Sequence, residues 1–523
     1  MHTPITMPRS LALAAAVLLA VVTTVAPTPV QAQSAPDLFV AAQGGSNASR
    51  RDVPSRRVRK ARLNLNALNA PTMRLRLFDD VQPVLTRTRI KQPAADQLVW
   101  IGRGDNGEQA VLAMARGVMT GTVFADGRVF EIGLEPDGQY SIAEIDSAAF
   151  PTDDPEFEGI NFEILEDPGN FVGDQVVAGA DGPATVDALT GTPVQVDVMV
   201  VWTPSAELAA GGAAAMNSLA LASIDNANLV YANSGVNAVL NLVYAGQVNY
   251  TENPASITTD LSNLRGTTDA YLNDVHAKRD EVGADIVTLF GEGYRNNGYC
   301  GYGGIMTTVS TSYAPYAFNV VDRSCAVSNL SFAHEVGHNQ GLHHDPANAS
   351  SAASTPYAYG YQDPAGAFRT LLSYGSATRV PYLSSPTLYY NGRVMGTSTQ
   401  DNARALAANI ATVAAFKSVG GTTTPTTPTT PTCSYSVSTT SLSFASTGGS
   451  KSVTVTATAG CSWSTANDAA VTWVGMSTGA GTGSGTVTVT TQANSSSARS
   501  TTITIAGTQI AVSQAAPKVN RRK

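Results

Sequence analysis

The sequence has little charge. Of its 523 residues, 14% are Asp, Glu, Lys or Arg, against roughly 25% in an average soluble domain. Acids outnumber bases by 40 to 32, which gives a net charge of -8. This balance argues against a protein that binds nucleic acid, because such a protein needs a basic face for phosphate. The length suggests about three domains.

Long apolar runs are also scarce, and the single candidate lies at the N-terminus. A positive residue, Arg9, precedes an apolar run over 11–25, and small residues at Val30 and Ala32 follow it. This pattern is typical of a secretory signal peptide. A membrane anchor would need ~20 apolar residues, and Pro27 interrupts this run before that length. We therefore expect a soluble protein that bacteria export to the extracellular space, with no membrane span.

Cysteine is rare as well, with four residues in the chain. Cys300 and Cys325 lie in one region, and Cys433 and Cys461 lie in another. Of the three possible pairings, two disulfides within domains are the simplest, and an exported protein folds where disulfides can form. The spacing is too wide for a zinc-binding cysteine pair.

Composition and pattern divide the rest of the chain. Residues 33–186 hold 15 bases and 22 acids, and a hairpin is predicted around Asp126-Gly127, so we expect a β-rich pro-segment. Further on, strands (194–202, 236–248, 284–290) alternate with helices (213–231, 268–282, 401–417), which favours a largely parallel sheet. The predicted parts are a signal peptide (1–32), a pro-segment (33–186), an α/β domain (187–419), a Thr/Pro linker (420–432), an all-β sandwich (433–516) and a basic tail (517–523).

Four of the six histidines fall within eleven residues. His334 and His338 are four apart, so on a helix they share one face and can chelate one zinc. Glu335 can reach a metal-bound water as general base, and Gly341 suits a helix that ends in the left-handed conformation. His344 then supplies a third nitrogen. Three protein ligands and an open position describe a catalytic zinc site.

Two other histidines, His343 and His276, are expected to lie outside the zinc site. His343 competes with His344 as third ligand, but the spacing favours His344, and we expect His343 to be a partly exposed neighbour. His276 lies in a charged stretch and is expected on the surface.

The motif resembles that of the metzincin clan of zinc endopeptidases. The resemblance implies a twisted mixed sheet, an active-site helix and a Met-turn beneath the zinc. The matching turn is Thr370-Leu-Leu-Ser-Tyr-Gly375, where Leu372 stands in place of the methionine. Leucine roughly conserves its volume. Tyr374 matches a tyrosine that stabilises the oxyanion in some metzincins, and packing is its alternative role.

Within the clan, the chain looks most like the reprolysin-like enzymes, and in particular the bacterial peptidyl-Asp metallopeptidases. That resemblance covers roughly 187–419 and implies cleavage on the amino side of acidic residues. A cation should then line the pocket for the residue after the cut. Arg379 is the candidate because guanidinium grips carboxylate in a fork; a structural salt bridge is the other interpretation.

Two further resemblances concern the flanking parts. Phe171-Val-Gly-Asp174 is similar to the Phe-x-Gly-Asp of astacin pro-segments, in which the aspartate caps the zinc, although a simple turn would also explain it. The C-terminal part resembles BACON domains, which are associated with carbohydrate binding. Trp463 and Trp473 would serve either such binding or the core.

The sequence thus predicts a secreted zinc-dependent endopeptidase that acts on protein or peptide substrates. Two alternatives remain open. One is a metzincin protease of broad specificity. The other is a non-catalytic zinc-containing adhesin that binds glycans or a cell surface, although zinc binding alone would not require Glu335.

Overall fold

The computed structural model describes residues 35–41, 53–135, 138–151, 191–417, 434–457, 462–467, 471–477, 480–482 and 484–517. The predicted signal peptide, Asp174, the Thr/Pro linker and the Cys433–Cys461 pair lie outside the described residues. In the part of the chain that is described, no helix has the length and apolar character needed to cross a membrane.

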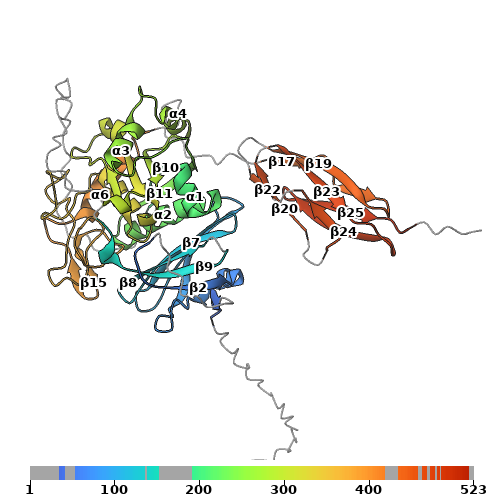
Figure 1. Ribbon diagram of the computed structural model, residues 1–523, viewed down its shortest axis with the longest axis horizontal. Coiled ribbons are helices and arrows are strands. Elements are labelled where there is room, and N and C mark those ends of the chain that lie inside the picture. The colour runs from blue at the N-terminus through green and yellow to red at the C-terminus, as the bar shows by residue number, and fades with distance from the viewer. Residues whose placement is uncertain are drawn as a thin grey trace, which may run out of the picture. The chain divides into compact units, whose positions relative to one another are not determined.

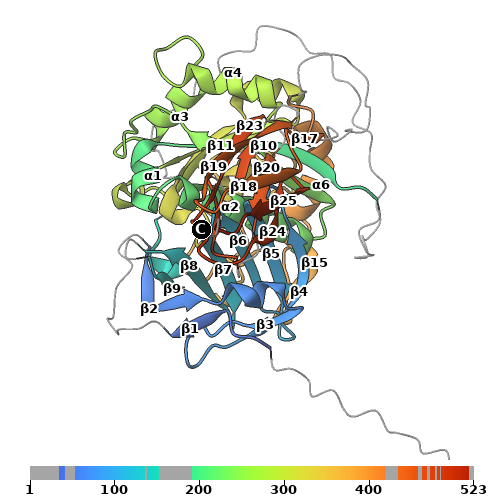
Figure 2. The same cartoon turned by 90° about the vertical axis from the view of Figure 1, so that its right-hand side faces the viewer.

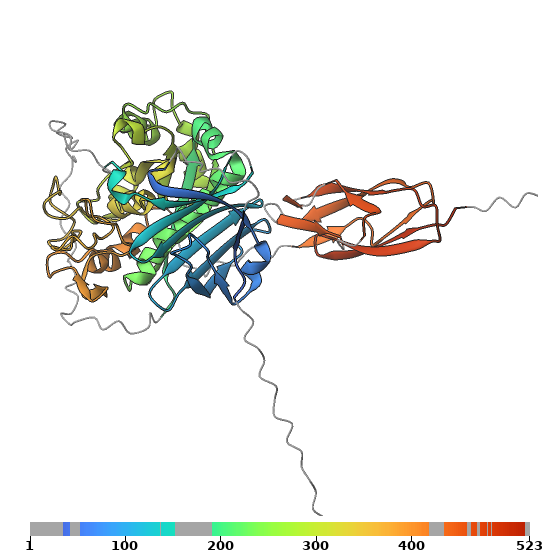
Figure 3. The same ribbon diagram turned by 60° about the horizontal axis from the view of Figure 1, so that its bottom comes forward.

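Residues 35–151 form an antiparallel sheet of nine strands in the order β1-β2-β9-β8-β7-β6-β5-β4-β3. The predicted hairpin is confirmed: Asp126 and Gly127 both have positive φ (52° and 70°) between β7 and β8, as its tight turn requires. The strands lie side by side in Figure 3, in blue and cyan. Their bounds are Phe39–Ala41, Ser55–Leu63, Thr72–Arg74, Val84–Lys91, Gln97–Arg103, Gln109–Ala115, Val118–Ala125, Arg128–Leu134 and Tyr140–Ile145 for β1 to β9.

Residues 191–417 form the predicted α/β domain. Its sheet has the order β11-β10-β12-β14-β13, in which the first four strands are parallel and β13 is antiparallel at one edge. A small hairpin, β15–β16, is separate. Figure 1 shows α1, α2 and α6 beside this sheet. The strands are β10 Val194–Trp202, β11 Ala238–Gln247, β12 Ile286–Gly291, β13 Gly301–Gly303, β14 Phe318–Asp322, β15 Ser385–Tyr390 and β16 Arg393–Met395. The helices are α1 Pro204–Ala210, α2 Ala213–Asn233, α3 Ile257–Arg265, α4 Asn273–Val282, α5 Ser331–Asn339 and α6 Asn402–Val413.

The helix predicted over 268–282 begins later, at Asn273. The Asp269 side chain accepts a hydrogen bond from the backbone N–H of Tyr271 (2.9 Å), and such a local turn competes with helix formation. Leu272 then has a positive φ of 50° directly before the helix. The prediction also missed α3, and it ran the last helix beyond its end at Val413.

The C-terminal residues form two facing sheets, as predicted. One has the order β17-β19-β23-β21 and the other β18-β25-β24-β20-β22, and Figures 1 and 2 between them label all of these strands except β21. Trp463 is buried in the core between the sheets, and Trp473 packs against that core while half-exposed. The bounds are Tyr435–Val437, Ser441–Phe444, Gly449–Ala457, Ser462–Ala466, Val474–Met476, Ala480–Thr482, Gly485–Thr491, Arg499–Ile505 and Thr508–Gln514 for β17 to β25.

Candidate metal centre

Helix α5 carries the first two histidines, and all nine of its residues are buried. His334 and His338 lie one turn apart on it. The chain then reverses at Gly341, which has a φ of 86°. A Cβ at this position would also lie 2.8 Å from Asn409 Nδ2, so both the backbone conformation and the available space require glycine. This turn brings His344 back to the helix.

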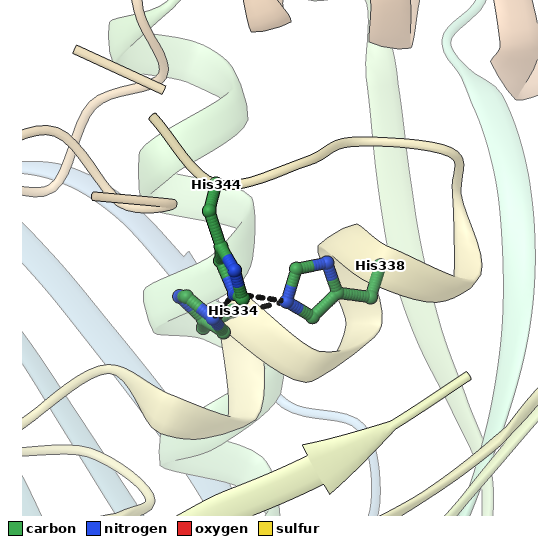
Figure 4. A group of neighbouring side chains, drawn as sticks. All are labelled: His334, His338 and His344. Carbon is green, nitrogen blue, oxygen red and sulfur yellow. Dashed lines mark hydrogen bonds between the residues drawn. The ribbon is translucent and has the colours of Figure 1, made fainter. Parts of the chain in front are cut away.

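The three imidazoles point toward one another (Figure 4). The Nε2 atoms of His334 and His338 are 3.1 Å apart, those of His338 and His344 are 2.9 Å apart, and those of His334 and His344 are 3.2 Å apart. All three side chains are buried. The structure therefore brings together the three nitrogen ligands that the spacing predicted.

The opposite ring nitrogens are held by backbone carbonyls. Nδ1 of His334 is 3.0 Å from the Leu371 oxygen, that of His338 is 2.9 Å from the Leu342 oxygen, and that of His344 is 3.3 Å from the Asn348 oxygen. A carbonyl can only accept, so each Nδ1 is the protonated nitrogen. Each Nε2 then presents a lone pair, as metal-binding histidines do.

These residues fit a zinc ion. Four-coordinate zinc with Zn–N distances of about 2.0–2.1 Å places its nitrogen ligands about 3.3 Å apart, close to the spacing of the three Nε2 atoms. Three buried lone pairs that face one another need a cation between them. Burial, followed by the charge of Arg379 and the other two histidines, holds the pKa of His334 well below its usual value, which favours the neutral, ligating form.

Glu335 is fully buried beside the edge strand β13. A Cβ at Gly301 would lie 2.4 Å from Glu335 Oε1, and one at Gly303 would lie 2.9 Å from Oε2. The two glycines therefore let the strand's backbone approach the carboxylate. Neither glycine was predicted from the sequence, although alternating glycines within a strand are a signal of such an approach. The predicted disulfide between Cys300 and Cys325 is present, with a Cα–Cα distance of 5.6 Å.

Leu372 and Tyr374 lie on the turn beneath and beside the histidines. Leu372 is fully buried, and its Cδ2 would be 3.2 Å from a Cβ at Gly337 of α5, so it forms an apolar floor in contact with the helix. The Tyr374 hydroxyl is 2.9 Å from Nε2 of His344. Its backbone N–H donates to Asp345 Oδ2 (3.1 Å), which joins the turn to the loop that carries His344.

Arg379 is nearly buried close to the same centre. Its Nη1 donates to the carbonyl of Asn329 (2.7 Å), just before α5, and its charge acts on His334. A second buried arginine, Arg369, was not anticipated. It donates to the carbonyls of Ser373 and Ala377 (the latter 3.0 Å) and so holds the turn itself.

The expectation for His343 was wrong. It is completely buried, because its Nδ1 accepts the backbone N–H of His344 (2.8 Å) and its Nε2 lies 3.0 Å from Ser351 Oγ. It stands outside the group of converging ligands. His276 is half-buried rather than at the surface, since its ring packs on Phe318.

Comparison with known proteins agrees with this geometry. Residues 192–403 match the family described as Metallo-peptidase family M12B Reprolysin-like. A peptidyl-Asp metalloendopeptidase of Stenotrophomonas maltophilia is 35% identical over 327 residues, which cover 60% of this chain and 72% of the relative. The chain belongs to the reprolysin-like metallopeptidases. A peptidyl-Asp metalloendopeptidase of Xanthomonas campestris pv. campestris is 32% identical over 316 residues, 59% of this chain and 70% of the relative.

The family assignment makes this protein a hydrolase, specifically a zinc metalloendopeptidase, and the family match lies within 192–403. Residues 462–515 match the BACON family, described as a domain to which a binding role is attributed. The crystal structure of metalloproteinase-II from Bacteroides fragilis is also similar, at 10% identity and a TM-score of 0.32, over 52% of this chain and 81% of that one.

Proposed function

We propose that this metallopeptidase is a secreted enzyme that cleaves peptide bonds on the amino side of Asp and Glu, with Glu335 as general base. The observation that carries the proposal is the gathering of a histidine triad, a buried carboxylate and a buried arginine at one centre. The names of the relatives, peptidyl-Asp metalloendopeptidases, support the acidic preference.

His334, His338 and His344 would hold the zinc. When bound, zinc supplies Lewis-acid polarisation of the scissile carbonyl and lowers the pKa of a coordinated water toward ~7. The protein's own contribution is to keep the three rings fixed through their Nδ1–H bonds to backbone carbonyls, so that little reorganisation is needed during catalysis.

Glu335 takes the proton from the attacking water and passes it to the leaving amine. Its position against Gly301 and Gly303 keeps the carboxylate in one place beside β13. Because β13 is the last strand of its sheet, an extended substrate can pair with it as a further strand, which would bring the scissile bond next to the base.

Tyr374 is proposed to donate its hydroxyl proton to the oxyanion of the substrate. The hydroxyl already lies within hydrogen-bond distance of His344, so a small movement of the side chain would redirect it to a substrate oxygen. Preorganised donors of this kind stabilise the charge that develops in the transition state.

Arg379 is proposed to recognise the acidic side chain that follows the cleaved bond. Its burial removes competing water, which strengthens a charge-assisted hydrogen bond to a carboxylate. Its bond to the Asn329 carbonyl fixes one side of the guanidinium.

The remaining assignments concern the flanking parts, with the boundaries given by the sequence. Residues 1–32 would direct export, 33–186 would act as the pro-segment with Asp174 as a cap on the zinc, and 433–516 would attach the enzyme to a surface or polysaccharide. Trp463 is a core residue, whereas Trp473 is half-exposed and lies under Arg499 (4.5 Å), so it is the better candidate for contact with a sugar.

The proposed acidic preference is tested with two peptides that differ only in whether Asp or Asn follows the scissile bond, and with a cleavage profile from a peptide library. We expect cuts before Asp and Glu, with kcat/KM at least about tenfold higher for the Asp peptide, a difference of about 1.4 kcal/mol. Efficient cleavage without acidic preference would support the broad-specificity alternative instead. A folded, zinc-loaded protein that cleaves no peptide would support the adhesin.

A further inference from the structure

The nine-stranded sheet of 35–151, here the N-terminal sheet, has buried apolar residues on both faces of its central strands, β5 to β9. Residues on one face, such as Trp100 and Phe130, belong to a core within this region. Those on the other face, including Val99, Val111 and Ile145, belong to the same core as the catalytic domain. These central strands therefore have no face suited to water.

The second face of the N-terminal sheet covers helix α2. It packs against β5, β6 and β7 of the N-terminal sheet and against β11 of the catalytic sheet. Seventeen of its 21 residues are buried, so it is covered nearly all round. A helix that is buried around most of its circumference requires such cover on more than one side.

Polar side chains of the N-terminal sheet also pair with polar side chains of α2. The hydroxyls of Thr120 and Ser218 are 2.7 Å apart, and Asn226 Nδ2 donates to Thr122 Oγ1 (3.0 Å). Lys91 forms an ion pair with the buried Asp225. Separating the two parts would leave groups without partners unless water replaced them, and buried polar groups are costly to leave unsatisfied.

Asn233, the last residue of α2, links the sheet to the substrate site. Its Oδ1 accepts from Gln109 Nε2 (3.1 Å) and from Arg103, and its Nδ2 donates to Gln109 Oε1 (2.8 Å) and to the Pro381 carbonyl (3.0 Å). The amide thereby uses both of its N–H groups and both acceptor positions. Pro381 is two residues after Arg379.

The same end of α2 supports the neighbouring parts of the site. The Tyr231 hydroxyl donates to Gln340 Oε1 (2.7 Å), directly after the zinc-binding helix. The Ser234 hydroxyl accepts the backbone N–H of Leu383 (2.8 Å). The position of the Arg379 segment therefore depends on α2, and α2 depends in part on the N-terminal sheet.

We propose that the N-terminal sheet is a lasting subunit of the enzyme. Cutting the chain between 151 and 191 leaves the two parts bound as a complex, and Gln109 acts through Asn233 as a positioning residue for the Arg379 segment. A pro-segment that leaves the enzyme after cleavage would have to separate readily, whereas this interface buries both an apolar face and matched polar pairs. The proposed pro-segment would therefore stay bound after it is cut. The positioning role of Gln109 toward the Arg379 segment rests on the proposed function, whereas the retention of the N-terminal sheet does not.

Retention is tested on the full chain with a recognition sequence for a specific protease inserted between 151 and 191. After complete cutting, we expect both fragments to elute together in gel filtration with zinc bound, and to separate in urea. Elution of a folded, active catalytic fragment free of the sheet would overturn the proposal. Because this readout needs no substrate, it stands even where the acidic preference fails.

The positioning role of Gln109 is tested with Gln109→Ala. This change removes the hydrogen bonds between Gln109 and Asn233 and leaves the hydrogen bond from Asn233 to the Pro381 carbonyl in place. Gln97→Ala, at a half-buried glutamine of the neighbouring strand, is the matched control. We expect kcat/KM for the Asp peptide to fall by about tenfold, equivalent to about 1.4 kcal/mol, with a smaller change for the Asn peptide and normal zinc content. Equal rates for both peptides in variant and control would rule out the positioning role.

The ion pair gives a second measurement of retention. In the cut protein, Lys91→Ala should lower the urea concentration at which the fragments separate. Arg89→Ala, an exposed cation on the same strand, should leave it unchanged. Identical curves for the two variants would count against the polar contacts as part of the lasting interface.

Discussion

The zinc-binding triad and the segment that carries Arg379 are built in different ways. Two of the three histidines are oriented by carbonyls only four residues away, those of Leu342 and Asn348. The Arg379 segment is instead held by Asn329, Asn233 and Ser234, which lie 50, 148 and 149 residues from their partners. Most of the contacts that orient the zinc-binding histidines are local, whereas the segment of Arg379, the residue proposed to select substrates, is positioned by distant parts of the chain.

This difference implies that turnover and selectivity respond to different substitutions. A change within the local motif should affect every substrate alike. A change in the long-range supports should alter the ratio between substrates. The following variants, ordered from the largest expected effect to the smallest, test that separation with the Asp and Asn peptides.

Glu335→Gln should have the largest effect and should show no preference between peptides. The amide cannot accept the water proton, so we expect kcat to fall by about 10³–10⁴-fold for both. Zinc content, measured by metal analysis, should stay at the wild-type level because Glu335 is not one of the three converging ligands. Residual turnover within about tenfold of wild type would contradict a role as general base.

Arg379→Gln should instead separate the two peptides. A hydrogen bond to a charged group contributes about 1.5–3 kcal/mol, so we expect kcat/KM for the Asp peptide to fall by about 10–100-fold and that for the Asn peptide to change little. Arg393→Gln serves as control, because this exposed arginine pairs with Asp363 (3.3 Å). An equal fall in kcat/KM for both peptides would show that Arg379 has a structural role and does not select the substrate.

Tyr374→Phe should reduce kcat by about tenfold for both peptides, since it removes one donor to the oxyanion. KM should change little if the hydroxyl acts only in the transition state. The measurement is a set of steady-state profiles at several substrate concentrations. A rise in KM with constant kcat would indicate that Tyr374 contributes to substrate binding alone.

Leu372→Met should have the smallest effect. The two side chains have similar volumes, and such exchanges in a core usually cost less than about 1.5 kcal/mol. Thermal unfolding of the zinc-loaded enzyme measures this change, and kcat should stay within about twofold of wild type for both peptides. A much larger loss of activity would show that the turn requires leucine in this chain.

The sequence was sufficient for the parts that depend on local pattern. The strand β10, the helix α2 and the strands β23 and β24 follow from apolar periodicity. The offsets of Gly341 and His344 from the first two histidines led to the converging nitrogens. In each case the decisive contacts or conformations involve residues close together in the chain.

The parts that sequence reasoning missed depend on contacts between distant residues. Only one hairpin of the N-terminal sheet was anticipated, because central strands such as β5 and β6 have apolar residues on both faces and lack the usual alternation. His343 is buried because the loop after it folds back to place Ser351 on its ring. The positions of Gly301 and Gly303 against Glu335 likewise depend on the tertiary fold.

The disulfide between Cys300 and Cys325 links the start of strand β13 to the short segment that leads into the zinc-binding helix, α5. The strand beside Glu335 and the segment that precedes its helix are thus joined covalently. In a reducing compartment, where thiols stay unpaired, the same chain would lack this link between strand β13 and the segment that leads into the helix of Glu335. The covalent link between strand β13 and the segment before the zinc-binding helix is therefore coupled to the redox conditions under which the protein folds.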